Sequence, residues 1–234
     1  MKKIPLLLLP GTLCDGRLWT HQIEHLADIA DPYVIDVGTD KNLATLAQRI
    51  LAEAPEKFAL AGFSFGGILA FELYRQAAQR ITRLALINTN ARPDTEQGLE
   101  IKRQQLQLAK LSGLETLLRE TLIPLYLAPE RNGDKALVQL IVDMAVAQGF
   151  GVLSNQIEAL ISRSDSRPLL GQVHCPTLVL GGMDDQLCTP ECHREMAAGI
   201  PGATLHLLEN CGHISTLEQP DTVSMAMLEW LSGI

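Results

Sequence analysis

The chain has 234 residues, 47% of them hydrophobic, and a formal net charge of −8 at pH 7. This hydrophobic content is enough for a full core and excludes an intrinsically disordered chain. The negative charge argues against nucleic acid or an anionic membrane as a partner. Five scattered cysteines are typical of reduced thiols rather than of a disulfide framework. We therefore expect a soluble cytoplasmic protein.

The first residues superficially resemble a secretory signal, because two lysines precede an apolar run over residues 4–9. The run is short, contains Pro5, and is followed by no cleavage site of small residues. We interpret it as the first buried strand. No segment is expected to reach transmembrane length.

Short apolar runs then alternate with segments of helical periodicity. Strands are predicted over residues 4–9, 33–37, 57–61 and 83–88, and helices over 18–26, 43–54 and 68–79. The strands are apolar almost throughout, as expected where helices cover both faces of a sheet. The alternation predicts an α/β fold with a doubly wound, mostly parallel sheet.

The alternation stops after residue 91. Helical spacing alone follows, over residues 99–111, 114–122, 135–148 and 152–161. Strands resume over 177–180 and 203–208, with helices over 191–198 and 218–231. We predict a core of residues 1–91 and 174–234 and a helical lid of residues 92–173. Such an insertion would cover the carboxyl edge of the sheet, where ligands bind in these folds.

A serine flanked by glycines lies between a predicted strand and helix, in Gly62-Phe63-Ser64-Phe65-Gly66. This is the G-x-S-x-G pattern of a nucleophile at a sharp strand-to-helix turn. Side chains at 62 and 66 would collide with the turn, the helix or the neighbouring strand. The turn would expose the Ser64 hydroxyl and leave the amide of Phe65 free to bind an oxyanion.

A serine nucleophile needs a base and an orienting carboxylate, and in such folds the chain order is Ser, then Asp or Glu, then His. His213 lies on a glycine-flanked loop just after the last strand, so it is the best base. Asp184 and Asp185 both follow the preceding strand, and spacing hardly separates them. The remaining histidines are placed less favourably, with His193 expected on a solvated helix surface: His21, His25, His174, His193 and His206.

A metal site is an alternative use of the residues near the C-terminus. The cysteines and histidines concerned are Cys188, Cys192, His193, Cys211 and His213. Their spacing matches no recognised zinc template, so we expect neither a metal nor another cofactor.

Over nearly its whole length the chain resembles the α/β-hydrolases. The resemblance lies in the runs of residues 9–12, 62–67 and 176–185, and in Gly212-His213 followed by Glu218 and Pro220. It implies an α/β-hydrolase fold with a lid, and it favours Asp185 over Asp184 as the acid. It also implies that the residue after Gly11, here Thr12, donates the second oxyanion amide beside Phe65. The family's N-terminal hairpin is missing, which predicts a sheet of about six strands.

The resemblance implies a serine hydrolase of small carboxylic esters, thioesters or lactones, most similar to small carboxylesterases of the pimeloyl-carrier-protein methyl esterase type and to enol-lactone hydrolases. A carbon–carbon bond hydrolase or lyase with the same triad is the alternative, and a non-catalytic ligand-binding relative is less favoured. Leu13 and Tyr126 are candidate substrate contacts. Basic lid residues offer a surface for an acyl-carrier partner, although a solvated helix face explains them more simply: Lys102, Arg103, Lys110, Arg119 and Arg131.

Overall fold

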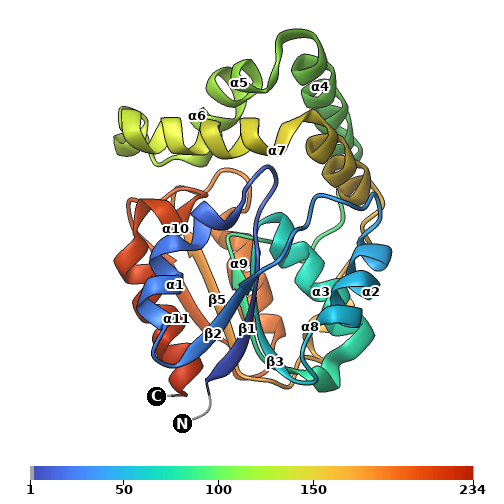
Figure 1. Ribbon diagram of the computed structural model, residues 1–234, viewed down its shortest axis with the longest axis vertical. Coiled ribbons are helices and arrows are strands. Elements are labelled where there is room, and N and C mark those ends of the chain that lie inside the picture. The colour runs from blue at the N-terminus through green and yellow to red at the C-terminus, as the bar shows by residue number, and fades with distance from the viewer. Residues whose placement is uncertain (1–2, 234) are drawn as a thin grey trace.

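A six-stranded, all-parallel sheet forms the centre of the molecule in the computed structural model, which describes residues 3–233 (Figure 1). The strand order is β2-β1-β3-β4-β5-β6, and every neighbouring pair is parallel. The strands are β1 (Ile4–Leu9), β2 (Ala30–Val34), β3 (Phe58–Phe63), β4 (Ile81–Ile87), β5 (Thr177–Gly182) and β6 (Thr204–Leu208). The predicted fold and number of strands are confirmed.

Helices cover both faces of the sheet because successive strand side chains point to opposite sides. Leu6 and Leu8 join one buried cluster with side chains of α1 (Thr20–Leu26) and α11 (Pro220–Ser232). On the opposite face of the sheet, Leu7 and Leu9 join a second buried cluster with side chains of α2 (Leu43–Glu53), α3 (Phe65–Ala77) and α9 (Pro190–Gly199). Shorter turns complete this part: η1 (Gly16–Trp19), η2 (Ala78–Arg80) and α10 (Ser215–Glu218).

A run of helices joins β4 to β5 and lies above the carboxyl ends of the strands (Figure 1). It comprises α4 (Glu96–Ser112), α5 (Leu114–Leu117), η3 (Leu118–Leu122), α6 (Ile123–Tyr126), η4 (Pro129–Arg131) and α7 (Lys135–Ile161). We call residues 96–161 the helical layer. Its buried side chains continue the cluster formed with α1 and α11, so the layer is packed onto the sheet.

The short helix α8 (Arg167–Leu170) also belongs to the segment predicted as a lid, but it lies elsewhere. Leu170 packs in the buried cluster that contains side chains of α2, α3 and α9. It also lies close to Gly199 of α9, since a Cβ added to Gly199 would lie 2.8 Å from the Leu170 side chain. The last part of segment 92–173 therefore flanks the sheet instead of covering its edge.

Helix α7 is the one described helix that is long and apolar enough to cross a membrane by length and composition, with a mean hydropathy of 1.8 over its most apolar part. By length and composition alone, α7 contradicts the expectation that no segment reaches this length. However, Gly149 has non-helical backbone angles (φ 81°, ψ 167°) and divides α7 into residues 135–148 and 150–161. Each half is shorter than the roughly 20 residues that span a bilayer.

Two local expectations need correction. The second strand begins at Ala30, three residues before the predicted start at Tyr33, and contains Pro32. Proline is tolerated there because β2 is an edge strand and can lack one donor. His193 is fully buried, not solvated, because it shares the inner face of α9 with Met196. Burial lowers the pKa of His193, which favours the neutral imidazole.

Candidate active site

Ser64 occupies the sharp turn between β3 and α3, where the sequence predicted a strained backbone. Its φ of 52° and ψ of −113° are unusual for a residue with a side chain. A Cβ on Gly62 would lie 2.3 Å from the Gly66 carbonyl oxygen, and one on Gly66 would lie 2.1 Å from that of Leu9. Both glycines are therefore required sterically, as predicted.

Three side chains from separate loops form one hydrogen-bonded line. His213 Nδ1 lies 2.8 Å from Asp185 Oδ2, and His213 Nε2 lies 2.9 Å from Ser64 Oγ. An ionised carboxylate only accepts hydrogen bonds, so Nδ1 donates to Asp185 and Nε2 accepts from the serine hydroxyl. This is the tautomer in which an imidazole can remove the serine proton.

Asp185 rather than Asp184 contacts His213. Besides His213, its carboxylate accepts hydrogen bonds from the backbone N–H groups of Leu187 and Cys188, each at 2.9 Å. Burial raises its pKa, but the neighbouring imidazole and the hydrogen bonds outweigh burial, so the pKa of Asp185 lies below its ordinary value. The Asp184 side chain has no such contacts among the described residues.

Asn88 is a further member of the site that the sequence did not reveal. It is fully buried at the end of β4, with a positive φ of 44°. Its Nδ2 donates to Asp185 Oδ2 at 3.0 Å and to the Gly212 carbonyl at 3.2 Å, while its Oδ1 accepts from Ser215 Oγ. The sequence feature that could have indicated Asn88 is its position at the carboxyl end of a predicted strand, where site residues lie in such folds.

The loop that carries His213 is attached to the helical layer. The backbone N–H of His213 donates to the Tyr126 carbonyl at 2.6 Å. Glu218, only 3% exposed, accepts from the N–H groups of Gly212 at 3.1 Å and Ala128 at 2.8 Å. Burial raises the pKa of Glu218 despite these hydrogen bonds. The position of the imidazole therefore depends on both layers of the molecule.

Two backbone N–H groups are available beside Ser64. Thr12 and Phe65 both line the cavity that contains Ser64 and His213. Within residues 3–233 neither amide donates a hydrogen bond, whereas the next amide, that of Leu13, donates to Gln156 Oε1 at 3.0 Å. Phe65 also begins α3, so the positive end of the helix dipole lies at the serine. These are the properties that an oxyanion hole requires.

The cavity has a volume of about 280 Å³ and lies between the strand ends and the helical layer. Tyr126 lines it, whereas Leu13, predicted to contact substrate, does not. Leu13 is 3% exposed and packs in the core, and its φ of 57° is positive. Leu122, Leu153 and Ile157 form much of the apolar wall.

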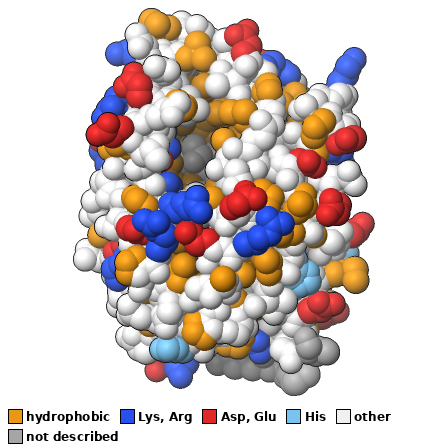
Figure 2. All heavy atoms as spheres, turned by 180° about the vertical axis from the view of Figure 1, so that it is seen from behind, with side chains coloured by type: hydrophobic (Ala, Val, Ile, Leu, Met, Phe, Trp, Pro, Cys, Tyr) orange, Lys and Arg blue, Asp and Glu red, His pale blue; other side chains and the backbone are white. Residues whose placement is uncertain are grey.

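Basic and acidic groups also reach this cavity. Lys102, expected on a solvated helix face, lines the cavity and pairs with Asp94. The cavity contains Cys188 as well, which sequence reasoning did not select for substrate contact. Seen from behind, the molecule has a hollow in its upper half, with Lys/Arg and Asp/Glu side chains side by side beneath it (Figure 2).

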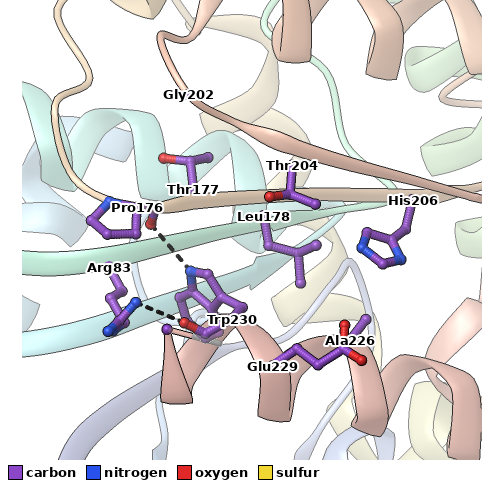
Figure 3. A pocket seen from close by; sticks show the side chains of 11 residues that line it. Arg83, Pro176, Thr177, Leu178, Gly202, Thr204, His206, Ala226, Glu229 and Trp230 are labelled. Carbon is purple, nitrogen blue, oxygen red and sulfur yellow. Dashed lines mark hydrogen bonds between the residues drawn. The ribbon is translucent and has the colours of Figure 1, made fainter.

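Another cavity, of about 230 Å³, lies near the amino ends of β4 and β5 (Figure 3). Arg83 and Trp230 face it, but Arg83 donates to the Trp230 carbonyl and Trp230 Nε1 donates to the Pro176 carbonyl. These two donors are thus already used within the fold. It contains none of the predicted site residues.

Two groups of described side chains lie close enough together to hold a metal ion. One comprises Asp185, Cys188 and His213, and the other His21, His25 and Asp221. In the first, both ring nitrogens of His213 are already hydrogen-bonded, so a metal there would displace either Asp185 or Ser64 from the imidazole. In the second, His21 already contacts Ser224 at 2.8 Å and Asp221 at 3.0 Å.

The parallel sheet, the strained serine turn and the loops that follow β5 and β6 together define a hydrolase of the α/β class. The chain belongs to the alpha/beta hydrolase family, whose model matches residues 6–226.

Among curated proteins, the chain is 28% identical to a protein named carbamate hydrolase RutD from Azorhizobium caulinodans, over 98% of this chain and 92% of that one. Among solved structures, it is similar to a thermophilic esterase from Thermogutta terrifontis, with a TM-score of 0.88, 27% identity and coverage of 99% and 90%. An enol-lactonase from Burkholderia xenovorans has the same TM-score at 23% identity, with coverage of 99% and 92%, which shows a shared fold.

Proposed function

We propose that this hydrolase cleaves a small carboxylic ester, thioester or lactone through an acyl-enzyme formed on Ser64. The observation that carries the proposal is the continuous line from the Ser64 hydroxyl through His213 to Asp185. A hydroxyl is a poor nucleophile at neutral pH unless a base accepts its proton during attack.

In the proposed first step, Ser64 Oγ attacks the carbonyl carbon and His213 Nε2 accepts the proton. Asp185 holds the tautomer and stabilises the imidazolium. The N–H groups of Thr12 and Phe65 bind the oxyanion. His213 then gives the proton to the leaving alcohol, and the C–O bond of the ester breaks.

In the second step, water attacks the acyl-enzyme while His213 accepts its proton. The carboxylic acid leaves, and Ser64 recovers its hydrogen from His213. The helical layer serves as a lid that limits the access of bulk water to this site.

The relatives named carbamate hydrolase support a second substrate class for the same site. A carbamate carbonyl passes through a similar tetrahedral intermediate, so the same residues would serve. A carbon–carbon bond hydrolase or lyase remains the alternative within the same geometry, and no observation on the cavity favours it.

Replacement of the nucleophile tests the proposal. Ser64→Ala is expected to lower the turnover of 4-nitrophenyl esters by at least about 10³-fold. Ser112→Ala, at an exposed serine of α4, is the matched control and should retain wild-type turnover. A panel of 4-nitrophenyl esters, an aryl carbamate and a vinylogous diketone compares the three substrate classes.

A covalent probe gives an independent measurement. An alkyl phosphonofluoridate should label the wild type and the Ser112→Ala variant with one equivalent, located on Ser64 by peptide mass spectrometry, and should not label Ser64→Ala. Unchanged ester turnover in Ser64→Ala would refute the proposed nucleophile.

A further inference from the structure

A group of three charged side chains lines the same cavity and has no part in the proposed acyl transfer. Asp94 follows β4, Lys102 lies on α4 and Arg163 follows α7. Asp94 Oδ1 lies 2.9 Å from Lys102 Nζ and 3.4 Å from Arg163 Nη2. All three are largely buried, with side-chain exposures of 10%, 20% and 9% for Asp94, Lys102 and Arg163.

Part of the hydrogen-bonding capacity of this group is not used within the fold, although Lys102 Nζ donates to Asp94 Oδ1 at 2.9 Å. Arg163 Nε is buried without a hydrogen-bond partner in the described chain, and so is Asp94 Oδ2. The Arg163 guanidinium has its 3.4 Å ion pair with Asp94, and its side chain makes no hydrogen bond to another of residues 3–233. Buried guanidinium groups normally use their N–H donors, because an unsatisfied buried charge is costly.

The charges of the group also do not cancel. Two cations face one carboxylate, which leaves one positive charge inside a protein whose formal net charge is −8. His213, which lines the cavity, accepts a hydrogen bond from Ser64 at Nε2, and among residues 3–233 no further charged side chain lines the cavity. One additional anion would balance the group.

We infer that Arg163, supported by Lys102, binds a carboxylate of the substrate away from the scissile carbonyl. The substrate class is then a small ester, thioester or lactone that carries a free carboxylate. A guanidinium matches a carboxylate through two parallel N–H donors, which a lysine cannot provide. The unpartnered Oδ2 of Asp94 can accept a hydrogen bond from a hydroxyl or amide of the same molecule.

This inference rests on the proposed function, because it assumes that the cavity at Ser64 holds the substrate. The size of the cavity agrees with a small substrate of this kind. Its volume of about 280 Å³ is near the lower end of the range of roughly 300–1,000 Å³ for ligand pockets. Its apolar wall of Leu122, Leu153 and Ile157 would contact the carbon chain between the two polar ends.

A pair of matched esters tests the inference on the acyl side. The 4-nitrophenyl monoester of adipic acid carries the carboxylate, and its monoamide has the same length without charge. A second pair, 4-acetoxybenzoate and phenyl acetate, places the carboxylate on the alcohol side. In the wild type, kcat/KM should favour the charged member of at least one pair by at least about tenfold.

Arg163→Met removes the charge while keeping a long side chain. It should raise KM for the preferred charged ester by roughly 30-fold, with the uncharged ester changing less than about threefold. Arg163→Lys should restore part of the preference, because it keeps the charge but loses the planar fork. Arg119→Met, an exposed arginine of the helical layer paired with Glu115, is the matched control and should leave both esters unchanged.

A binding measurement separates this inference from the proposed function. In Ser64→Ala, calorimetry should detect hexanoate binding more tightly than hexanamide, and the double variant with Arg163→Met should lose the difference. If hydrolysis fails but this preference persists, the anion site stands and the proposed function fails. A charged-to-uncharged ratio that Arg163→Met leaves unchanged, or an equal fall for both esters, would overturn the anion site.

Discussion

At the scale of single residues, the two adjacent aspartates differ completely in environment. Asp185 is 2% exposed and accepts hydrogen bonds from His213, Asn88 and two backbone N–H groups. Asp184 is half-buried, and its backbone N–H donates a hydrogen bond to the Cys211 carbonyl at 2.9 Å. A shift of one position along the chain thus decides which carboxylate meets the imidazole.

We predict that Asp185→Asn lowers ester turnover by about 10⁴-fold, because an amide in this place no longer fixes the Nδ1–H tautomer. Asp184→Asn, which makes the same chemical change next to it, should stay within about threefold of the wild type. Steady-state kinetics on one 4-nitrophenyl ester measures both variants. Equal losses in the two would contradict the assignment of Asp185.

At the scale of elements, the site is assembled from parts that lie far apart in the sequence. Glu218 at the end of α10 connects the His213 loop to the segment after α6, through Gly212 and Ala128. A Cβ on Gly212 would lie 2.5 Å from the Tyr126 carbonyl oxygen, so the two segments are in close contact. The helical layer therefore helps to hold the imidazole in place.

We predict that Glu218→Gln destabilises the protein by about 1–3 kcal/mol, because the amide can accept from only one of the two N–H groups. For a domain of this size that lowers Tm by roughly 2–4 °C per kcal/mol. Glu209→Gln, at an exposed position on the same loop, should change Tm by less than one degree. A scan of thermal unfolding compares the two, and equal Tm values would contradict the structural role of Glu218.

At the scale of the whole molecule, buried ionisable groups couple folding to pH. Burial lowers the pKa of His193, whose Nδ1 lies 3.1 Å from the Thr189 carbonyl and whose Nε2 has no partner in the described chain. The folded state then binds fewer protons than the unfolded state just below the ordinary histidine pKa. The contribution of His193 to the free energy of unfolding is therefore complete above about pH 6.5. It is lost as the pH falls through the pKa that His193 has in the folded state.

We predict that the free energy of unfolding of the wild type declines between pH 7 and pH 5. His193→Asn should flatten this decline, since the amide can keep the bond to Thr189 without titrating, although the lost ring volume lowers stability at every pH. His174→Asn, at an exposed position, should leave the slope unchanged. Urea titrations at several pH values measure the slopes, and an unaltered slope in His193→Asn would contradict this account.

Much of the fold followed from local patterns. The apolar runs of β1, β3, β4 and β5 are each close to their predicted positions, because buried parallel strands must be apolar on both faces. The edge strand β6 is also close to its predicted position, although most of it is exposed or half-buried. The edge strand β2 was displaced, because its register depends on pairing with β1 and not on its own composition. The inner face of α9 was missed because the buried Cys192, His193 and Met196 alternate along the sequence with charged residues.

The sequence alone determined that a serine lies on a glycine-bounded turn and that a histidine and a pair of aspartates follow later strands. Steric exclusion at Gly62 comes from Gly66 in the same turn, so a short motif suffices to predict it, whereas the exclusion at Gly66 comes from Leu9 of the neighbouring strand. Only the tertiary structure decided that Asp185 meets His213, that Asn88 joins them, and that Arg163 and Lys102 face the cavity of Ser64. These contacts form only when the sheet and the helical layer pack against each other. Spacing along the sequence does not encode the distances between segments that this packing brings together.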